Sequence, residues 1–529
     1  MSDVDNLRQQ LRDRGYLTHG IERWFALDPW SSRAFWLELA TVALKAAILI
    51  AAFGALPPTA VMLARNHPLS ALEILGIFVS YAAAWVVAAF AFVVIVALIL
   101  KLRPSLPIDT PRALLAISLA VSALFVAPIA IWWYRFDTAA TTIELIAGIA
   151  LSVVFFLVAT IVVSAALLSF SIYELQRIPT IHRRSRTIPM SLAAAVLIAL
   201  LFVPAYADRD RAFLEPMVVT TPTSRRVALI AVDGLTFDIV QSRPDLASAL
   251  PHIAAVQPIP GASTTERWAS LGTGVPTEAH GVRAIEGIRF SGGSHVIQRI
   301  SRGDFVLMGL APLVRIARRE PLPPTVRKRD YIWEIFTERG VTSVAVNWWA
   351  TSDTDEGALT SVSPEHVFTG AGADPLKLDA IATDRFLAAI AKRNPRFATV
   401  YLPALDVILN RIELDRTTQL AKSIRALDGL TNTITLVRAR GYDVVLAGMP
   451  GDRQQGSAVV ASTVPLKTRT AWDVAPAVLD LLGFPLSGEM PGGPPGSRIA
   501  SYGPRASSNE AVTMNEEYYE NLKSLGYIR

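Results

Sequence analysis

The chain has 529 residues, of which 52% are hydrophobic and only 18% are charged, whereas a soluble globular protein has about 25% charged residues. The formal net charge of +5 is small for this length and does not favour a nucleic-acid partner. The chain contains no cysteine, which excludes disulfides, thiolate metal sites and a cysteine nucleophile.

The deficit of charge is concentrated in the N-terminal part of the chain. A helix rises about 1.5 Å per residue, so about 20 apolar residues cross a hydrocarbon core of about 30 Å. Stretches of this kind lie at 43–64, 72–100, 113–134, 142–171 and 189–207. We therefore predict a transmembrane helix bundle of about five spans within 35–207, with the lipid bilayer as its partner.

The basic residues of the short loops predict how the bundle is oriented. They cluster between the second and third stretches and between the fourth and fifth, and such residues stay on the cytoplasmic side. We expect a cytoplasmic N-terminal segment at 1–34 and, after an odd number of spans, a linker at 208–224. One large domain at 225–529 would then lie outside the cytoplasm, in the periplasm or beyond.

The first motif of this domain is the segment VALIAVDG at 227–234. An apolar run that ends in Asp-Gly is typical of a buried strand whose carboxyl end lies at the ligand-binding edge of an open α/β sheet. Asp233 would point to that edge. The alternative is that Asp233 is an ordinary turn residue.

The second motif lies in the segment 261–282, GASTTERWASLGTGVPTEAHGV. Ser263 and Glu266 have the spacing of a capping box, which predicts a helix start. Thr264 would lie in the first turn, where free N–H groups and the helix dipole favour a phosphate. Its hydroxyl is a candidate nucleophile, which a nearby metal would activate. The alternative is that Ser263 and Thr264 only cap the helix.

Together these segments resemble the alkaline phosphatase superfamily, in its type I phosphodiesterase/nucleotide pyrophosphatase branch. The matching residues are Asp233, Thr264, Trp268, Thr273-Gly274, Pro276 and His280-Gly281, followed by segments at 332–351, 472–485 and 521–528. The resemblance implies a mixed, mainly parallel sheet with helices on both faces. It covers nearly all of 225–529 and says nothing about the apolar half.

The resemblance also implies a site with two zinc ions. The family's ligands are the first Asp, the Thr or Ser nucleophile, a D-x-x-x-H pair, an Asp-His pair in a D-H-G turn and one later His. Asp233 and Thr264 match this set. Asp406 matches the Asp of D-x-x-x-H, but Asn410 stands where the His is expected.

The second half of the ligand set is missing. Gly448 and Met449 stand at the positions of the Asp-His pair, and no histidine follows His366. Loss of four ligands is expected to abolish a two-zinc site. His280 belongs to the family's His-Gly turn, where packing or capping is the expected role, and His295 and His366 are expected in solvated loops.

An all-oxygen cation site remains as an alternative. Asp233, Thr264, Asp406 and Asn410, with Asp452 as a further donor, carry the oxygen ligands that magnesium or calcium accepts. In that case Thr264 would attack phosphorus while a single divalent cation activates it.

The sequence therefore leaves three functions open. The first is a domain with a degenerate zinc site that binds a phosphorylated lipid, glycan or nucleotide, or an envelope protein, and acts as a scaffold. The second is an active hydrolase or headgroup phosphotransferase, because helices before such a domain resemble the bacterial phosphoethanolamine transferases and lipoteichoic acid synthases. The third, transport by the helices, has no motif to support it.

Overall fold

The computed structural model describes two units of the chain. The described residues are 10, 13, 34–66, 69–102, 111–134, 142–174, 223–261, 263–299, 304–452, 454–494, 498–505 and 515–528. Unit 1 comprises Met1–Asp208 and Ile288–Arg318, and unit 2 comprises Arg209–Gly287 and Arg319–Arg529.

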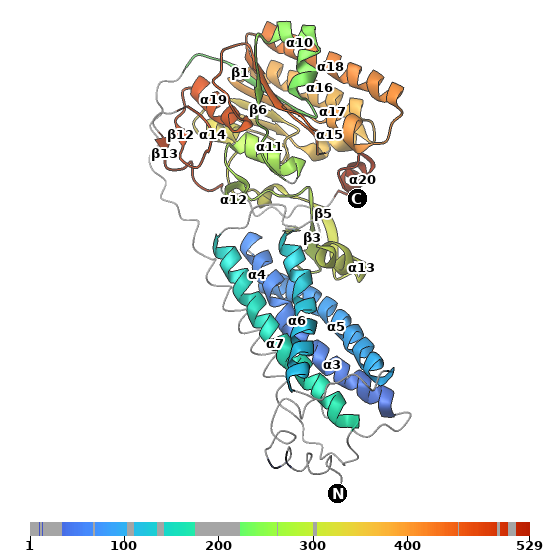
Figure 1. The fold of residues 1–529 in the computed structure, drawn as a ribbon. Coiled ribbons are helices and arrows are strands. Elements are labelled where there is room, and N and C mark those ends of the chain that lie inside the picture. Colours follow the sequence, from blue (N-terminus) through green and yellow to red (C-terminus); the bar gives the residue numbers. More distant parts are fainter. Residues whose placement is uncertain are drawn as a thin grey trace. The chain divides into compact units, whose positions relative to one another are not determined.

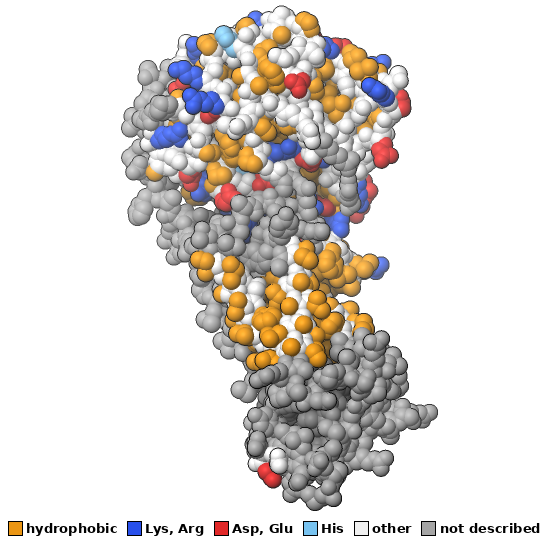
Figure 2. Space-filling view, viewed as in Figure 1, with side chains coloured by type: hydrophobic (Ala, Val, Ile, Leu, Met, Phe, Trp, Pro, Cys, Tyr) orange, Lys and Arg blue, Asp and Glu red, His pale blue; other side chains and the backbone are white. Residues whose placement is uncertain are grey.

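Unit 1 contains a bundle of apolar helices. They are α3 (Ala34–Gly54), α4 (Leu56–Arg65), α5 (Ala71–Leu102), α6 (Pro111–Tyr134) and α7 (Thr142–Glu174). Apolar side chains gather on the surface of these helices, whereas charged side chains are scattered over unit 2 (Figure 2). The chain is therefore a membrane protein.

The helices account for four of the five predicted spans. The segments Ala40–Arg65, Ala71–Ile95 and Ile146–Ala166 are long and apolar enough to cross a membrane, and Leu115–Ile129 is a shorter apolar helix. The predicted fifth span at 189–207, almost all of the N-terminal segment 1–34 and most of the linker 208–224 lie outside the described residues.

Unit 2 is built on a mixed, mainly parallel sheet, as predicted. The strand order among the described residues is β2-β11-β10-β1-β9-β6-β8-β7. Strand β1 (Val227–Asp233) lies in the middle and is buried along its whole length, because it pairs in parallel with β10 (Asp443–Met449) and β9 (Phe397–Leu402). The continuous apolar run at 227–232 is the pattern of a strand covered on both faces.

Helices cover the sheet on both faces (Figure 1). Helices α16 (Pro375–Arg393) and α18 (Arg416–Ala439) lie on one side, and α14 (Ile332–Glu338) and α19 (Val474–Leu481) on the other. The outer strands are β2 (His252–Val256), β11 (Ala458–Ser462), β6 (Ser343–Val346), β8 (Leu359–Val362) and β7 (Thr354–Glu356). The remaining helices of unit 2 are α9 (Phe237–Gln241), α10 (Pro244–Ala249), α11 (Thr264–Thr273), α12 (Thr277–His280), η3 (Pro324–Val326), α15 (Pro364–Ala371), α17 (Ala404–Asp406), η4 (Val407–Arg411), η5 (Ala471–Asp473) and α20 (Glu516–Ser524).

Residues 288–318 are an insertion that belongs to unit 1 although the chain enters and leaves it from unit 2. The strands around it are β3 (Glu286–Phe290), β4 (Ile297–Gln298) and β5 (Ala317–Pro321), in the order β4-β3-β5, and it carries the short helices η2 (Val306–Leu310) and α13 (Ala311–Leu313). Short strands β12 (Leu486–Ser487) and β13 (Arg498–Ile499) pair near the C-terminus.

Candidate functional site

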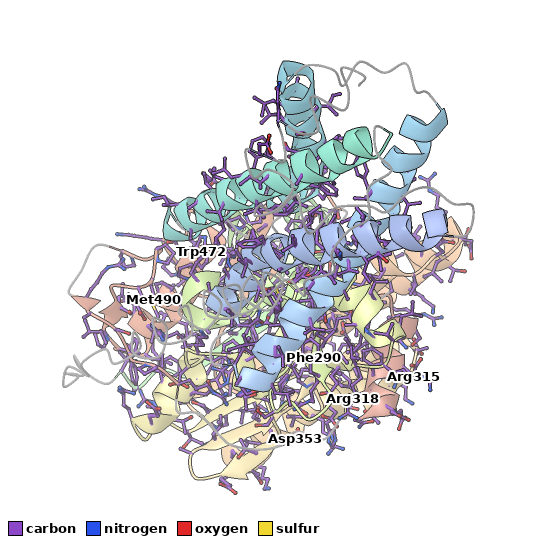
Figure 3. All side chains as sticks on the ribbon, turned by 90° about the horizontal axis from the view of Figure 1, so that it is seen from below. Phe290, Arg315, Arg318, Asp353, Trp472 and Met490 are labelled. Carbon is purple, nitrogen blue, oxygen red and sulfur yellow. The ribbon has the colours of Figure 1, made fainter. Side chains whose placement is uncertain are left out.

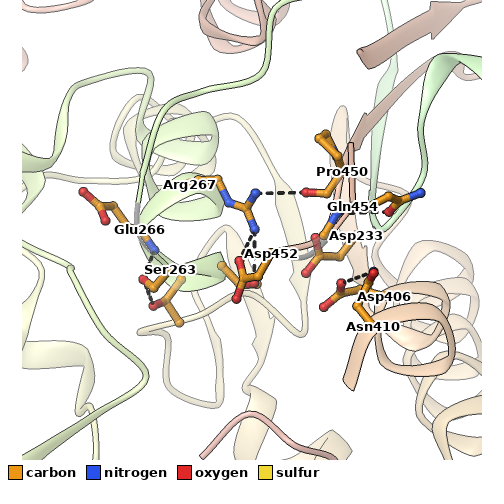
Figure 4. A network of polar contacts seen from close by, with 12 residues as sticks. Asp233, Ser263, Glu266, Arg267, Asp406, Asn410, Pro450, Asp452 and Gln454 are labelled. Atoms are coloured by element: carbon orange, nitrogen blue, oxygen red, sulfur yellow. Dashed lines mark hydrogen bonds and ion pairs between the residues drawn. The ribbon is translucent and has the colours of Figure 1, made fainter. Parts of the chain in front are cut away.

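Three aspartates meet at the carboxyl ends of three neighbouring strands. Asp233 is the last residue of β1, Asp406 follows β9 by four residues, and Asp452 follows β10 by three. Because β10, β1 and β9 are parallel neighbours, their carboxyl ends lie at one edge of the sheet, where ligands of open α/β folds bind. Figure 4 shows the three side chains together.

Thr264 is the first residue of helix α11, as the capping pattern predicts. Ser263 is the N-cap, and its Oγ accepts a hydrogen bond of 3.1 Å from the backbone N–H of Glu266. The same Oγ donates to the carbonyl oxygen of Arg283 at 2.6 Å, which holds the start of the helix in place. Thr264 is fully buried.

Two arginines converge on the Thr264 hydroxyl. The Nη2 atom of Arg411 donates to Thr264 Oγ1 at 2.6 Å, and Nη2 of Arg267 lies 3.5 Å from the same oxygen. Arg267 also donates from Nη1 to the carbonyl of Pro450 at 2.9 Å (Figure 4). The threonine oxygen is therefore surrounded by guanidinium groups.

The same arginines pair with two of the aspartates. Arg411 donates from Nε to Oδ2 of buried Asp406. Asp452 bridges the pair: Oδ1 accepts from Arg267 at 2.6 Å, and Oδ2 lies 3.6 Å from Arg411. The Arg411 guanidinium also lies 4.1 Å above the Tyr527 ring, a cation–π contact. Burial opposes the charge on Arg411, but the nearby acids raise its pKa, so it stays ionised.

Asp406 is saturated by partners from its own segment. Besides Arg411, Asn410 donates from Nδ2 to Asp406 Oδ1 at 2.8 Å. A Cβ on Gly451 would lie 1.9 Å from Asp406 Oδ1 and 2.3 Å from Asn410 Nδ2, so the loop after β10 is packed against these two side chains. Gly234 has a φ of +80° and its backbone lies against Asp406, where only glycine fits.

Asp233 is the least satisfied of the three aspartates. Oδ2 accepts a hydrogen bond of 3.0 Å from the hydroxyl of Tyr401, but Oδ1 is buried without a hydrogen-bond partner among the described residues. Burial, and then the charge of Asp406, raise the pKa of Asp233 to about 7, against the opposing effect of Arg267 and Arg411. The carboxyl group of Asp233 therefore holds its proton to a higher pH than an exposed aspartate does.

The donor set does not fit the two zinc ions that the family resemblance implies. The described residues contain no group of three or more His, Cys, Asp or Glu side chains that could hold a metal ion. Asn410 presents its amide N–H₂ to Asp406, and the Arg411 guanidinium contacts both Asp406 and Thr264. A cationic side chain thus stands between two of the expected metal ligands, and it would repel a divalent cation.

The predicted site residues Asp233, Thr264, Asp406 and Asn410 are brought together, with Asp452 beside them. Sequence reasoning missed Arg267, Arg411 and Tyr401. The signal for Arg411 was its place directly after Asn410, the position where a zinc-binding histidine was expected. For Arg267 the signal was its place three residues after Thr264, one helical turn along the same face.

His280 lies outside this cluster. It is fully buried, its Nδ1 accepts from the backbone N–H of Val282 at 3.1 Å, and its Nε2 lies 2.9 Å from Ser270 Oγ. Burial, with the charges of Arg283 and Arg327, lowers the pKa of His280 to about 3. It is therefore a neutral histidine that ties helix α11 to the His-Gly turn.

Comparison with known proteins finds one family model that matches part of the C-terminal unit. Residues 227–447 match the family model described as type I phosphodiesterase/nucleotide pyrophosphatase. No curated protein sequence matches the chain.

Several solved structures are similar to the chain at low identity. Phosphonoacetate hydrolase from Sinorhizobium meliloti, in complex with phosphonoformate, is 13% identical over 44% of this chain and 60% of its own, with a TM-score of 0.30. Murine ectonucleotide pyrophosphatase/phosphodiesterase 5, in an inactive form with AMP, is 13% identical over 42% and 56%, with a TM-score of 0.29. The chain thus spans about 60% or less of the length of these relatives.

A further similar structure is that of an integral membrane protein. The integral membrane protein lipooligosaccharide phosphoethanolamine transferase A from Neisseria meningitidis is 11% identical over 82% of this chain and 95% of its own, with a TM-score of 0.30. The family match thus agrees with the resemblance of the C-terminal unit to the type I phosphodiesterase/nucleotide pyrophosphatase branch of the alkaline phosphatase superfamily, and apolar membrane helices precede the matched residues in the chain.

Proposed function

We propose that the C-terminal unit is a metal-independent binding domain for a phosphorylated ligand and does not hydrolyse it. The observation that carries the proposal is the position of Arg411, whose guanidinium contacts both Asp406 and Thr264. In the family that the sequence resembles, the residues at these two positions are metal ligands. A guanidinium that satisfies both of them supplies the positive charge that a metal would supply.

Turnover is disfavoured because Thr264 has no base. Within the described part of the chain, its hydroxyl oxygen has hydrogen-bond contacts to Arg267 and Arg411 and to no carboxylate. A guanidinium remains protonated at neutral pH and cannot take a proton from a hydroxyl. A neutral hydroxyl without a base or a metal is a weak nucleophile.

A phosphate group fits the arginine pair by charge and by shape. Planar guanidinium groups bind phosphate through paired charge-assisted hydrogen bonds, and the first turn of the ten-residue helix α11 adds a positive helix end. Asp452 now bridges Arg267 and Arg411, and its side chain is 37% exposed. Asp452 thus acts as an internal anion, which a phosphorylated lipid headgroup, glycan or nucleotide would displace.

The setting of the domain follows from the membrane helices. We propose that the N-terminus is cytoplasmic, that the C-terminal unit lies outside the cytoplasm, and that the bilayer or an envelope protein brings the ligand to it. The basic clusters between the apolar stretches support this orientation.

Calorimetry on the full chain in detergent tests the binding step. AMP and phosphoethanolamine are titrated after chelation of metals. Asp452→Asn removes the competing charge and is expected to tighten binding, whereas Arg267→Gln is expected to weaken it. Equal affinity for wild type and both variants would contradict the proposal. Asp443→Asn, which removes the surface partner of Arg225, is the matched control.

Elemental analysis and a phosphodiesterase assay test the absence of turnover. We expect no bound metal and no hydrolysis of a generic phosphodiester when zinc, magnesium, manganese or calcium is added in turn. A bound metal, with turnover that is lost in Thr264→Ala and Asp233→Asn, would instead establish an active hydrolase or phosphotransferase with a rebuilt cation site.

A further inference from the structure

The insertion at 288–318 is held to the membrane helices by buried polar contacts. The Asn66 side chain, at the end of α4, accepts from the Gln298 N–H at 2.7 Å and donates to its carbonyl at 3.2 Å. The hydroxyl of Tyr81, in α5, donates to Asp304 at 2.8 Å. Without the insertion, lipid would surround these polar side chains of the helices.

A third contact joins His295 of the insertion to helix α5. The carboxylate of Glu73, fully buried in the first turn of α5, accepts from the backbone N–H of His295 at 2.7 Å and lies 3.0 Å from its Nδ1. His295 thus lies in an exposed loop, as expected, with 45% of its side chain exposed, and it is also a partner of a membrane helix. It could not be recognised from sequence, because 222 residues separate it from Glu73.

Apolar packing completes the attachment. A Cβ on Gly76 would lie 2.9 Å from the Phe290 ring, so glycine lets the insertion approach the helix closely. Val306 and Leu307 of η2 are buried in one cluster with Ile77 and Phe78 of α5. One side of the first turns of α5 is therefore covered by protein.

The length of α5 agrees with this arrangement. Its 32 residues would extend about 48 Å, more than the hydrocarbon core of about 30 Å. The candidate span Ala71–Ile95 has 25 residues and would extend about 38 Å, and the first turns of α5, which the insertion covers on one side, lie at one end of this span. The insertion then lies at the surface of the bilayer.

The opposite face of the insertion is apolar and exposed. Phe305 is 67% exposed, Leu313 76% and Val314 62%, and Leu310 and Ile316 are exposed as well. Two exposed arginines, Arg315 and Arg318, follow the helices in the chain (Figure 3). A soluble surface would not keep such a patch without a partner.

We propose that residues 305–318 form an interfacial membrane anchor. Phe305, Leu313 and Val314 insert at the boundary between headgroups and acyl chains, and Arg315 and Arg318 contact lipid phosphates. Apolar residues flanked by arginine are the composition of segments that lie in the membrane interface. This inference does not depend on the proposed function, since it concerns unit 1 alone.

The bilayer is favoured over a protein partner because the membrane helices belong to the same unit. Leu72, Leu75 and Val79 of α5 are exposed large apolar residues of the same unit, at the end of the helix that the insertion covers on another side. Residues 305–318 thus belong to the same unit as exposed apolar side chains of a membrane helix, whose surroundings are lipid. A second copy of the chain is the alternative occupant.

The absence of cysteine makes site-specific labelling the direct test. Leu313→Cys and Val314→Cys are labelled with an environment-sensitive fluorophore in the full chain in nanodiscs of phosphatidylglycerol and phosphatidylcholine. We expect blue-shifted emission, quenched more by lipids with a nitroxide near the headgroup than near the chain end. Leu420→Cys, on exposed Leu420 of α18 in unit 2, is the control and should show neither effect.

Each other outcome contradicts the anchor. Emission at Leu313 and Val314 like that at Leu420 would place the segment in water. A blue shift without quenching by either lipid would show protein contact. Energy transfer between labelled chains, lost when excess unlabelled chain is added before reconstitution, would identify a second copy. Arg315→Gln combined with Arg318→Gln tests the arginine contacts. Quenching of the wild-type segment should be stronger in nanodiscs that contain phosphatidylglycerol than in nanodiscs of phosphatidylcholine alone, and the double variant should lose this difference. If the difference persists, the arginines do not contact the lipid phosphates.

Discussion

Arg411 donates a hydrogen bond from Nη2 to the Thr264 hydroxyl oxygen at 2.6 Å, across 147 residues of sequence. The same guanidinium pairs with Asp406. The side chain that the resemblance assigns as nucleophile and the side chain that it assigns as a metal ligand are therefore joined by an internal cation. Four predictions follow from this arrangement and its surroundings.

Removal of Arg411 should be costly. Arg411→Ala leaves Asp406 as a buried carboxylate without its charged partner, and loss of one member of a buried pair costs about 3–5 kcal/mol of unfolding free energy. Asp406→Asn combined with Arg411→Gln removes both charges and should recover much of the loss. Thermal unfolding followed by tryptophan fluorescence measures both variants. An Arg411→Ala melting temperature equal to wild type would show that the pair carries no stability.

Metal chelation should leave the fold unchanged. A ligand that binds only the native state raises its apparent stability by mass action, so a structural zinc would reveal itself by a lower melting temperature after chelation. We expect equal melting temperatures with EDTA, without it, and with added zinc. A rise of the melting temperature with zinc that is lost in Asp233→Asn would contradict the metal-free site.

The raised pKa of Asp233 predicts a pH dependence of stability. Its ordinary pKa of 3.8 becomes about 7 in the folded state, so between these values the folded protein keeps a proton that the unfolded chain has released. The stabilising contribution is complete below about pH 4 and is lost as the pH rises to 7, at up to about 1.4 kcal/mol per pH unit.

Burial also raises the pKa of Asp379 to about 7, so Asp379 contributes to the pH dependence in the same direction. This contribution is present in both wild type and Asp233→Asn, and the difference between the two proteins therefore isolates the contribution of Asp233. The melting temperature of Asp233→Asn should fall less between pH 5 and pH 8 than that of wild type. Equal slopes would mean that Asp233 stays ionised throughout this range.

The glycine in the loop after β10 should not tolerate a side chain. A Cβ at Gly451 would lie 1.9 Å from Asp406 Oδ1, so Gly451→Ala is expected to displace the loop and separate Asp452 from Arg267. Gly429 lies in helix α18, and apart from its chain neighbours and the nearby helix backbone nothing lies within 4 Å of its Cβ position. Gly429→Ala should therefore be neutral or stabilising by up to about 1 kcal/mol. The melting temperatures of the two variants test this expectation. Equal effects of Gly451→Ala and Gly429→Ala would contradict the close packing of the loop against Asp406.

The apolar helices and the central strand could be predicted from sequence because their signals are local. A run of apolar residues at 72–100 specifies a long apolar helix wherever it lies, and VALIAVD specifies a strand covered on both faces. The cap at Ser263 is local as well, since its partner is the N–H three residues later. The loss of the family's histidines was also visible from residue types alone.

Only the tertiary structure shows which groups take the place of the missing histidines. Arginine is common on surfaces, and its place after Asn410 does not reveal the partners of Arg411, which include Thr264, Asp452 and the Tyr527 ring. The attachment of His295 to Glu73 had no local signal either. In both cases the partners come from segments far apart in the chain, and burial makes an unpaired charge so costly that the fold brings such pairs together.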